Sequence, residues 1–469
     1  MRLRTYFLLI FIFSTNFVNA QSKIQNLSKA FNKLLNDDQA KHAITSLCVL
    51  DAKTGKVLFA HNEQVGMATA STLKTITAAT AFSILGKDFQ YQTTLAYSGN
   101  ITNDGTLQGN LIVIGSGDPT LGSWRYQNKE NTVLTQWVNA IRAAGIKKIE
   151  GAIIGDDRIF GTQTTPEGWV WQDIGNYYGA GTSGLSWREN QFDIHLKPGN
   201  KLTDEVKVVK TVPDMPYVKI VNELKTGSSG TGDHAYAFIP PYSNIGYLRG
   251  SWGMGIGKTG ISVALPDPAF DCAFRLQDTL KRLGIVSSLP ATTTRLMILN
   301  NQPIPTVTQK ISTINSPTLS EITYWFMKKS INLYGETLLK TIAFKSGKVG
   351  TTAKGVETEV NFWATKGIDK SALNIIDGSG LSPGNRITTS AMANILYLAQ
   401  KEDWFSEYYK ALPDHNGMKI KSGTINDVSA FSGYHTDSSG NKYIIVISIN
   451  NYTGSGINKK LFGVLDELK

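Results

Sequence analysis

Three short segments, hundreds of residues apart, carry side chains that together could perform acyl transfer. They are Ser71-Thr72-Leu73-Lys74, Ser330-Ile331-Asn332 and Lys421-Ser422-Gly423-Thr424. A serine hydroxyl becomes a nucleophile when a neighbouring base takes its proton. The spacing of three places Lys74 one helical turn from Ser71, on the same face. The segments therefore predict a serine acyl-transfer site that works without histidine.

The two lysines have different expected roles. Lys74 can act as the base only if its amine is neutral, which requires desolvation or a nearby positive charge that lowers its pKa. Lys421 is the candidate for that charge and could also attract a substrate carboxylate. Ser330 would relay a proton between the base and the leaving amine, and Asn332 would hold Lys74 and the substrate amide by hydrogen bonds.

The third segment supplies groups for binding the substrate. Gly423 would let a substrate strand approach closely. The backbone N–H groups of Ser71 and Thr424 would form the oxyanion hole, and the hydroxyls of Ser422 and Thr424 could bind a terminal carboxylate. Each segment alone is a frequent chance match, so the prediction rests on their order and joint occurrence.

The two ends of the chain contain the elements that would position these segments. The pattern predicts a helix over 22–41, a hairpin of strands 44–50 and 56–60, and a helix over 71–85. Near the other end it predicts strands over 429–434 and 443–450 and a terminal helix with Leu461, Leu465 and Leu468. The two hairpins can pair into one antiparallel sheet flanked by helices, an α/β (α+β) fold.

A long stretch separates Ser71 from Ser330, too long for a simple connection. The pattern within it predicts strands over 93–99, 108–114 and 149–155, helices over 132–143 and 268–283, and a β-rich part at about 190–265. We expect a catalytic domain of residues 21–90 and 286–469, interrupted by an inserted domain, 91–285. The β-rich part is interpreted as a smaller subdomain nested inside the insertion.

The first twenty residues have the pattern of a secretory signal peptide. Arg2 and Arg4 precede a short apolar run, Tyr6 to Phe13, and Val18-Asn19-Ala20 supplies permissive residues for cleavage. An uncleaved anchor is the alternative. No later run approaches the ~18 apolar residues of a membrane span, so we expect an exported protein, periplasmic or facing the cell wall, without a stable membrane anchor.

The overall charge and the cysteines exclude some classes of function. The formal charge of +10 falls to +8 when Arg2 and Arg4 are removed, but the basic residues form no single run, which argues against nucleic acid as a partner. Cys48 and Cys272 are interpreted as core residues, with a disulfide between them as the alternative. The histidines show no metal-ligand spacing, so no metal is expected.

Several other matches are rejected on their context. Gly255–Gly260 (GIGKTG) fits G-x-G-x-x-G, but a strand-like run follows it where a helix is needed. Gly380–Gly384 (GLSPG) fits the nucleophile elbow, but Pro383 removes a backbone donor needed next to the serine. His415 and His435 lie near the third segment and are not predicted to be catalytic.

The order of the three segments resembles that of the penicillin-recognising serine enzymes. The chain is similar to one branch, the class C low-molecular-mass penicillin-binding proteins, which are D-alanyl-D-alanine carboxypeptidases and endopeptidases. Nearly the whole mature chain shares this resemblance. Its further matches are Gly117–Leu121 (GDPTL), Pro166–Asp173 (PEGWVWQD) leading to Tyr178 and Ser183, Val263–Pro268 (VALPDP) and Asp377–Ser382 (DGSGLS).

The resemblance implies a transpeptidase-like domain with an insertion after the Ser71–Lys74 helix, and an enzyme that cuts peptidoglycan peptides through an acyl-enzyme. β-Lactams would acylate Ser71, and no metal or organic cofactor is expected. The chain departs from the family at Ile331, at Ser422, in a short segment 412–421, and at Pro383, where relatives often carry a basic residue. Arg386 follows further on. Asp173 is a candidate for binding an ammonium group of the substrate, with a purely structural role as the alternative.

Two other functions stay open. A serine β-lactamase would need a group that activates water, a Glu of the class A type or a Tyr in the middle segment, where this chain has Ser330. A non-catalytic wall-binding protein could retain the fold, although all the expected catalytic residues are present. The sequence leaves open the oligomeric state and the balance of carboxypeptidase to endopeptidase activity.

Overall fold

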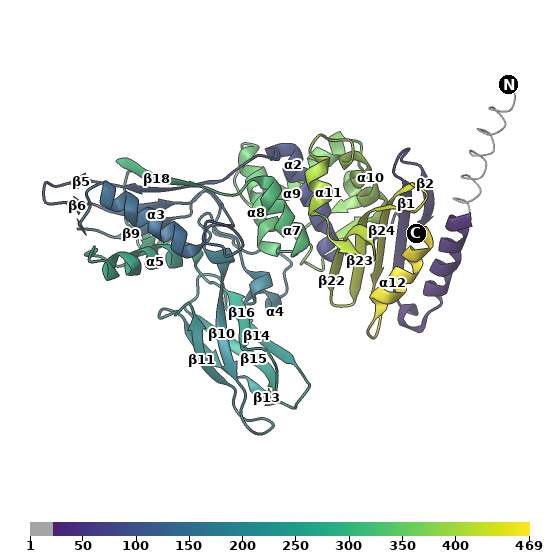
Figure 1. Cartoon of the computed structure of the whole chain (residues 1–469), viewed down its shortest axis with the longest axis horizontal. Coiled ribbons are helices and arrows are strands. Elements are labelled where there is room, and N and C mark those ends of the chain that lie inside the picture. Colours follow the sequence, from purple (N-terminus) through teal and green to yellow (C-terminus); the bar gives the residue numbers. More distant parts are fainter. Residues whose placement is uncertain (1–21) are drawn as a thin grey trace.

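The computed structural model describes residues 22–469, so the predicted signal peptide lies outside the described residues. A six-stranded antiparallel sheet unites the two ends of the chain, as predicted (Figure 1). Its order is β2-β1-β24-β23-β22-β21. The strands are β1 (Ile44–Asp51), β2 (Val57–His61), β21 (Asp414–His415), β22 (Met418–Ile425), β23 (Val428–Thr436) and β24 (Lys442–Asn450).

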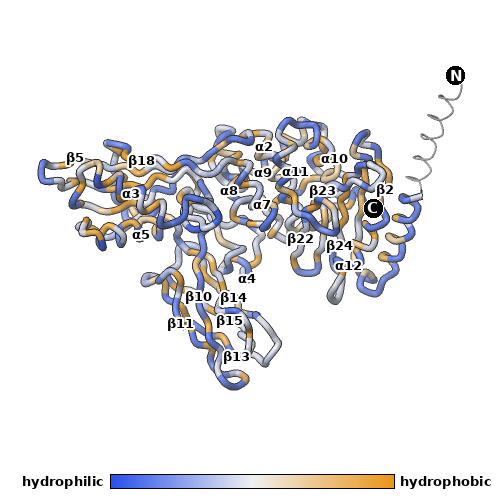
Figure 2. Tube along the Cα trace, viewed as in Figure 1, coloured by the Kyte–Doolittle hydropathy of each residue, from blue (hydrophilic) through white to orange (hydrophobic). Residues whose placement is uncertain are grey.

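Alternating residues of this sheet pack against helices on its two faces. Leu47 and Val49 contact the helix of residues 22–35 and the terminal helix α12 (Ile457–Leu465), whereas Cys48 and Leu50 belong to the core that includes the central helices. The central strands are apolar along most of their length (Figure 2). The first helix ends before the predicted residue 41, because Asp37 caps a separate 3-10 turn, Asp38–Ala40.

A group of helices covers the inner face of the sheet and carries two of the three segments. They are α2 (Lys74–Leu85), α7 (Leu319–Lys328), α8 (Asn332–Lys345), α9 (Thr352–Thr365), α10 (Thr389–Ala399) and α11 (Phe405–Ala411). A small sheet, β19 (Leu373–Asn374), β20 (Arg386–Thr388) and β3 (Gly66–Met67), lies beside them.

The insertion contains its own five-stranded sheet and hydrophobic core. The sheet order is β17-β9-β7-β4-β18, with α3 (Glu130–Ala143) and α5 (Pro268–Arg282) packed against it. The strands are β4 (Gln92–Tyr97), β7 (Leu111–Ile114), β9 (Ile153–Asp156), β17 (Thr292–Thr293) and β18 (Gln309–Asn315). The predicted strands 108–114 and 149–155 are each divided, because β6 (Thr106–Gln108) and β8 (Lys148–Ile149) form a separate sheet with β5 (Asn100–Ile101). A short helix, α6 (Thr294–Leu299), follows β17.

The strand pairing does not follow the expected domain boundary at residue 285, because two strands after this residue pair into the inserted sheet. Both β17 and β18 pair into the inserted sheet, β18 antiparallel to β4 over six register positions. The sequence near residues 309–315 does not indicate that this strand pairs with β4, which lies more than two hundred residues earlier in the chain. We propose that the inserted domain extends to about residue 315.

A second β-rich unit projects from the inserted domain (Figure 1). Its core residues, among them Phe192, Leu248 and Trp252, form a separate hydrophobic cluster. One sheet has the order β11-β10-β16, and in the other β12 and β13 both pair with β15, as does β14. The strands are β10 (Gln191–Lys197), β11 (Lys207–Val212), β12 (Lys219–Asn222), β13 (Lys225–Gly227), β14 (Asp233–Phe238), β15 (Ile245–Gly253) and β16 (Gly260–Ala264).

This unit occupies the range of the expected nested subdomain. Between residues 22 and 469, no helix is long and apolar enough to cross a membrane.

Candidate active site

Ser71 and Lys74 meet at the junction of two kinds of helix. Ser71 lies in a 3-10 turn, Ala70–Leu73, and Lys74 is the first residue of α2, so the predicted continuous helix from 71 is divided here. A 3-10 turn has three residues per turn, which aligns positions i and i+3. Lys74 Nζ accordingly lies 2.8 Å from Ser71 Oγ.

The second segment connects α7 to α8 and reaches the same lysine. Asn332 begins α8, and its Oδ1 accepts a hydrogen bond from Lys74 Nζ at 2.7 Å. Its Nδ2 donates to the Tyr178 carbonyl at 2.8 Å. Ser330 is half-buried with φ of +56°, in the left-handed region that non-glycine residues rarely adopt. The chain therefore makes a sharp turn at Ser330 just before Asn332 enters the site.

The third segment lies on β22, beside the turn that carries Ser71. Gly423 permits this approach, because a Cβ at this position would lie only 2.8 Å from the backbone nitrogen of Ser71 and 2.7 Å from the carbonyl oxygen of Thr69. Lys421 is buried, whereas Ser422 is half-buried and Thr424 is exposed. The structure thus brings the third segment to Ser71, with its two hydroxyl residues in reach of solvent.

The surroundings of Lys74 favour a neutral amine. Complete burial lowers its pKa well below the ordinary value, and the charge of Lys421 lowers it further, while Asp377 and Glu336 oppose the shift. Burial also lowers the pKa of Lys421, to about 7. Among the described residues neither lysine forms an ion pair; Lys421 Nζ donates to the Ser422 carbonyl at 2.7 Å.

The three partners of Lys74 suit both protonation states. The third partner is the Ser379 carbonyl, at 2.6 Å from Nζ. An ammonium group could donate one hydrogen to each acceptor. A neutral amine could donate to Asn332 and Ser379 and use its lone pair to accept the Ser71 hydroxyl proton. Lys74 can therefore take and return a proton without losing its position.

The loop that supplies Ser379 was identified in the sequence only as a family-like segment. Its Asp377 accepts hydrogen bonds from Gly380 N, Ser382 N and Trp169 Nε1, at 2.6–2.9 Å. The Gly378 amide donates to both carboxylate oxygens of Glu336, at 3.0 and 3.1 Å. These buried acids hold the loop against α2 and α8.

Glu336, Asp377 and Ser379 had no assigned role in the sequence prediction. Glu336 had one detectable signal, its position one helical turn after Asn332 on the same face. Burial and Asp377 raise the pKa of the Glu336 carboxyl.

Asp173 lies near the site but does not contact the three segments. It belongs to the short helix α4 (Trp171–Ile174) and is half-buried. Burial raises the pKa of its carboxyl, and a hydrogen bond from the Tyr178 side chain partly offsets the rise. The Tyr178 carbonyl accepts a hydrogen bond from Asn332, so Tyr178 links Asp173 to the candidate site.

Residues of the sequence motifs that were rejected as catalytic make structural contacts. Ser382 is buried and donates to the Gly168 carbonyl at 3.0 Å. Lys258 is exposed in the nested unit and pairs with Asp233 at 3.1 Å. Arg386, in the region where relatives often carry a basic residue, turns its guanidinium to the carbonyls of Pro383 and Asn385.

The hydrogen bonds of Lys74 in the described structure involve no cysteine or histidine. Cys48 and Cys272 are both free and buried in different hydrophobic clusters, so they are not bridged. Burial lowers the pKa of His415 and of His435. Within residues 22–469, no group of three or more His, Cys, Asp or Glu side chains is arranged to hold a metal ion.

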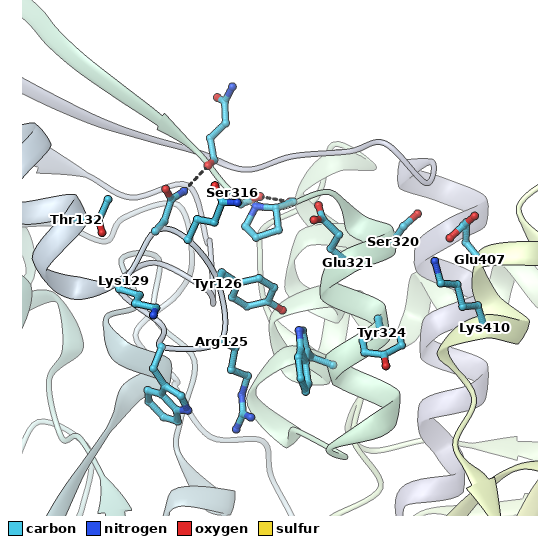
Figure 3. A pocket seen from close by; sticks show the side chains of 16 residues that line it. Arg125, Tyr126, Lys129, Thr132, Ser316, Ser320, Glu321, Tyr324, Glu407 and Lys410 are labelled. Atoms are coloured by element: carbon cyan, nitrogen blue, oxygen red, sulfur yellow. Dashed lines mark hydrogen bonds between the residues drawn. The ribbon is translucent and has the colours of Figure 1, made fainter.

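A groove of the described structure lies away from the three segments. It has a volume of about 1040 Å³ and lies between the loop of residues 124–129 and helices α7 and α11 (Figure 3). Arg125 is held there by Glu189 at 2.9 Å and lies over the rings of Trp124 and Trp325. None of the predicted site residues lines it.

The chain is similar to known proteins over nearly its whole length. Residues 27–468 match the model of the D-Ala-D-Ala carboxypeptidase 3 (S13) family. A D-alanyl-D-alanine carboxypeptidase of Actinomadura sp. (strain R39) is 24% identical over 452 residues, which cover 88% of this chain and 79% of the relative.

Two solved structures share the fold. The crystal structure of penicillin binding protein 4 (dacB) from Haemophilus influenzae superposes with a TM-score of 0.79 at 22% identity, covering 94% of this chain and 98% of that one. The same protein complexed with a β-lactam has a TM-score of 0.73 at 21% identity, with the same coverage. The predicted penicillin-recognising fold is therefore confirmed.

The family match also confirms the resemblance that the three segments indicated. It extends over almost all of the described residues, including the insertion. The chain belongs to the D-Ala-D-Ala carboxypeptidase 3 (S13) family and is a serine-type D-Ala-D-Ala carboxypeptidase.

Proposed function

We propose that this enzyme trims and cuts the stem peptides of peptidoglycan, with Ser71 as its nucleophile and Lys74 as its base. The observation that carries the assignment is the 2.8 Å contact between Lys74 Nζ and Ser71 Oγ, in surroundings that lower the pKa of the lysine. A buried neutral amine next to a hydroxyl is the arrangement that activates a serine without histidine.

Acylation transfers one proton and breaks one amide bond. Lys74 takes the Ser71 hydroxyl proton while Ser71 Oγ attacks the carbonyl carbon of the penultimate D-alanine. The oxyanion is stabilised by the backbone N–H groups of Ser71 and Thr424. When the intermediate collapses, the terminal D-alanine leaves as an amine after receiving the proton from Lys74 through Ser330.

Deacylation repeats these steps with water in place of Ser71. A water molecule attacks the ester carbonyl, its proton passes to the neutral Lys74, and the Ser71 oxygen leaves and is reprotonated. Asn332 keeps Lys74 in position and is within reach of the substrate amide. Lys421, Ser422 and Thr424 are proposed to bind the terminal carboxylate, and the close approach at Gly423 holds β22 beside Ser71.

The same site is proposed to cut cross-links. In an endopeptidase reaction the leaving group is a second stem peptide, which needs open space beyond the scissile bond. The exposed position of Thr424 and the two-residue edge strand β21 support such an opening. Asp173 is proposed to bind the ammonium of a diamino acid side chain. Its half-buried carboxyl accepts a hydrogen bond from the Tyr178 side chain, and the Tyr178 carbonyl accepts one from Asn332.

Two further proposals concern inhibition and location. A structure of penicillin binding protein 4 from Haemophilus influenzae is complexed with a β-lactam. We propose that β-lactams acylate Ser71 in this chain, and that the protein is exported to the periplasm or cell wall, where its substrate lies.

The test is mass spectrometry of the products from defined muropeptide monomers and cross-linked dimers. Loss of one D-alanine from the monomer would report carboxypeptidase activity, and conversion of dimers to monomers would report endopeptidase activity. Ser71→Ala should abolish both products. Unchanged product formation by this variant would refute the mechanism.

A further inference from the structure

One face of the nested unit carries aromatic side chains that its core does not use. In β14 and β15 the residues alternate between the two faces of the sheet. Ala235, Ala237 and Leu248 point into the hydrophobic cluster. Tyr236, Phe238, Tyr247 and Arg249 alternate with them and therefore point outward. With Trp171 from α4, these four residues are here called the aromatic face.

The members of the aromatic face are in contact and form one surface. The guanidinium of Arg249 lies 5.3 Å from the ring centre of Phe238 and 5.1 Å from that of Tyr247. The Phe238 and Trp171 ring centres are 6.0 Å apart. Glu223, which directly follows β12, pairs with Arg249, with 2.8 Å between Nε and Oε2. Arg249 thus lies between the rings and an acidic side chain.

The surface remains accessible to solvent. Trp171 is 50% exposed and Tyr247 is 37% exposed, values that are high for such large rings. Contiguous exposed aromatic rings on a soluble protein mark a binding surface more often than chance exposure.

The aromatic face begins at the rim of the catalytic site. Trp171 lies two residues before Asp173 on α4, and α4 packs against β14. In Figure 1, α4 lies where the strands of the nested unit meet the rest of the molecule. Tyr178, whose carbonyl accepts a hydrogen bond from Asn332, lies near Tyr236, and burial together with neighbours that include Tyr236 raises the pKa of the Tyr178 hydroxyl. A ligand in the site could therefore extend onto this face.

We propose that the aromatic face binds the glycan strand that bears the stem peptide being cut. Sugar rings present polarised C–H groups on their faces, which are attracted to the negative face of an aromatic ring, and hydroxyl and amide groups at their edges. In this proposal a sugar stacks on the face of the exposed Tyr247 ring that Arg249 does not cover, and Arg249 and Glu223 offer hydrogen-bonding groups beside it. The glycan is favoured over a protein partner because the face continues from the candidate catalytic site, where the stem peptide carried by that glycan would be bound.

This inference rests on the proposed function, because it assumes that the stem peptide enters the site attached to its glycan. The probe is peptide-free glycan strands, prepared by removing the stems from purified peptidoglycan, and the protein is the full mature chain. Co-sedimentation or interferometry would give the affinity for the probe. Release of D-alanine would be measured in parallel on intact peptidoglycan and on a short soluble peptide ending in D-Ala-D-Ala.

Tyr247→Ala should weaken glycan binding about fivefold, the loss expected for one aromatic contact. The rate on intact peptidoglycan should fall by a similar factor, and the rate on the short peptide should stay within about twofold. Tyr247→Phe keeps the ring and should bind like wild type. Trp124→Ala is the matched control, because Trp124 is 48% exposed but lines the groove of Figure 3 instead of the aromatic face.

Three outcomes would overturn the proposal. They are unchanged glycan binding in Tyr247→Ala, an equal loss in Trp124→Ala, or binding only to peptide-bearing material, which would assign the face to the stem peptide. Unchanged melting temperature would show that Tyr247→Ala is folded. If it is not, Trp171→Ala, which removes another exposed ring of the aromatic face, should also weaken glycan binding, and unchanged binding by that variant would overturn the proposal. Ser71→Ala separates this inference from the proposed function, since it should lose hydrolysis of the short peptide while binding glycan strands normally.

Discussion

Two buried acids of the inserted region and two buried lysines of the catalytic region differ in their partners. Each of the acids has a cationic partner: Asp271 pairs with Arg275 at 2.9 Å and Asp267 pairs with Arg295 at 2.8 Å. In the catalytic region Lys74 and Lys421 are buried with only neutral hydrogen-bond acceptors. A paired buried charge holds structure, whereas an unpaired buried lysine has a lowered pKa and can exchange a proton.

A third buried lysine, Lys340, shows that burial and a lowered pKa alone do not identify a catalytic base. Lys340 on α8 donates to the Gln163 carbonyl at 2.6 Å, and burial lowers its pKa to about 8. It joins α8 to the inserted region, and its partner in this hydrogen bond is a backbone carbonyl and not a hydroxyl. A lowered lysine pKa therefore indicates a catalytic base only together with a neighbouring hydroxyl, such as that of Ser71, the proposed nucleophile.

Replacing the unpaired lysine should cost activity and leave the fold intact. Lys74→Met should slow acylation by a labelled penicillin by at least about 10³-fold, within the range for loss of a general base. Because the folded state lowers the lysine pKa, the unfolded chain holds the proton more tightly at neutral pH, so removing Lys74 should not reduce stability. Stopped-flow kinetics measures the acylation rate and thermal melting measures the stability of Lys74→Met. A large fall in melting temperature would contradict the view that this lysine serves activity and not stability.

Replacing one partner of a pair in the inserted region should have the reverse effect. Arg275→Met leaves the buried Asp271 without its cation and should reduce the free energy of unfolding by about 3 kcal/mol. The acylation rate of the folded protein should stay within about twofold, since Arg275 lies outside the catalytic region. Denaturant titration and penicillin labelling measure the two quantities. Lost acylation in folded protein would show that the regions are coupled.

The contact between β22 and the nucleophile turn can be tested through Gly423. Gly423→Ala places a Cβ 2.8 Å from Ser71 N, so either β22 or the turn must move. We expect acylation to slow by about 10- to 100-fold, because a shift of ~1 Å at a reacting group can cost that much. Gly463→Ala on α12 is the matched control, since its Cβ would meet no atom within 4 Å. Equal rates in the two variants would contradict the proposed packing.

The smallest predicted effect concerns pH. Acylation needs neutral Lys74, so it should rise as pH passes the lowered pKa of that amine; it needs charged Lys421, so it should fall again as pH passes about 7. Lys421→Arg keeps its charge at alkaline pH and should extend the profile upward, at a lower overall rate. The second-order rate constant of acylation, measured as a function of pH for both proteins, tests which lysine sets each limb of the profile. An unchanged alkaline limb would exclude Lys421 as its source.

The sequence predicted those parts of the site that depend on residue type and local spacing. Ser71 and Lys74 are three residues apart, and Asn332 and Lys421 could be proposed because their short segments follow in the expected order. The Ser379 and Tyr178 carbonyls could not be predicted, because a backbone carbonyl has no residue type to mark it. Their positions depend on contacts across hundreds of residues.

The same distinction applies to the fold. The terminal hairpins and the helices α3 and α5 follow from local periodicity, and α5 begins at Pro268 with Asp267 as its cap. The proposed move of the boundary from residue 285 to about 315 depends on the pairing of β18 with β4, a long-range contact that no local pattern contains. The break between the 3-10 turn and α2 at Lys74 also has no local signal, since the 71–85 run is uniformly helix-compatible.

The most direct test of the central claim is peptide mapping after brief exposure to a labelled penicillin. We predict one penicilloyl group per molecule, located on the peptide that contains Ser71, and almost none in Lys74→Met over the same time. Label on another residue, such as Ser382, or equally fast labelling of Ser71 in Lys74→Met, would contradict the assignment of a lysine-activated serine.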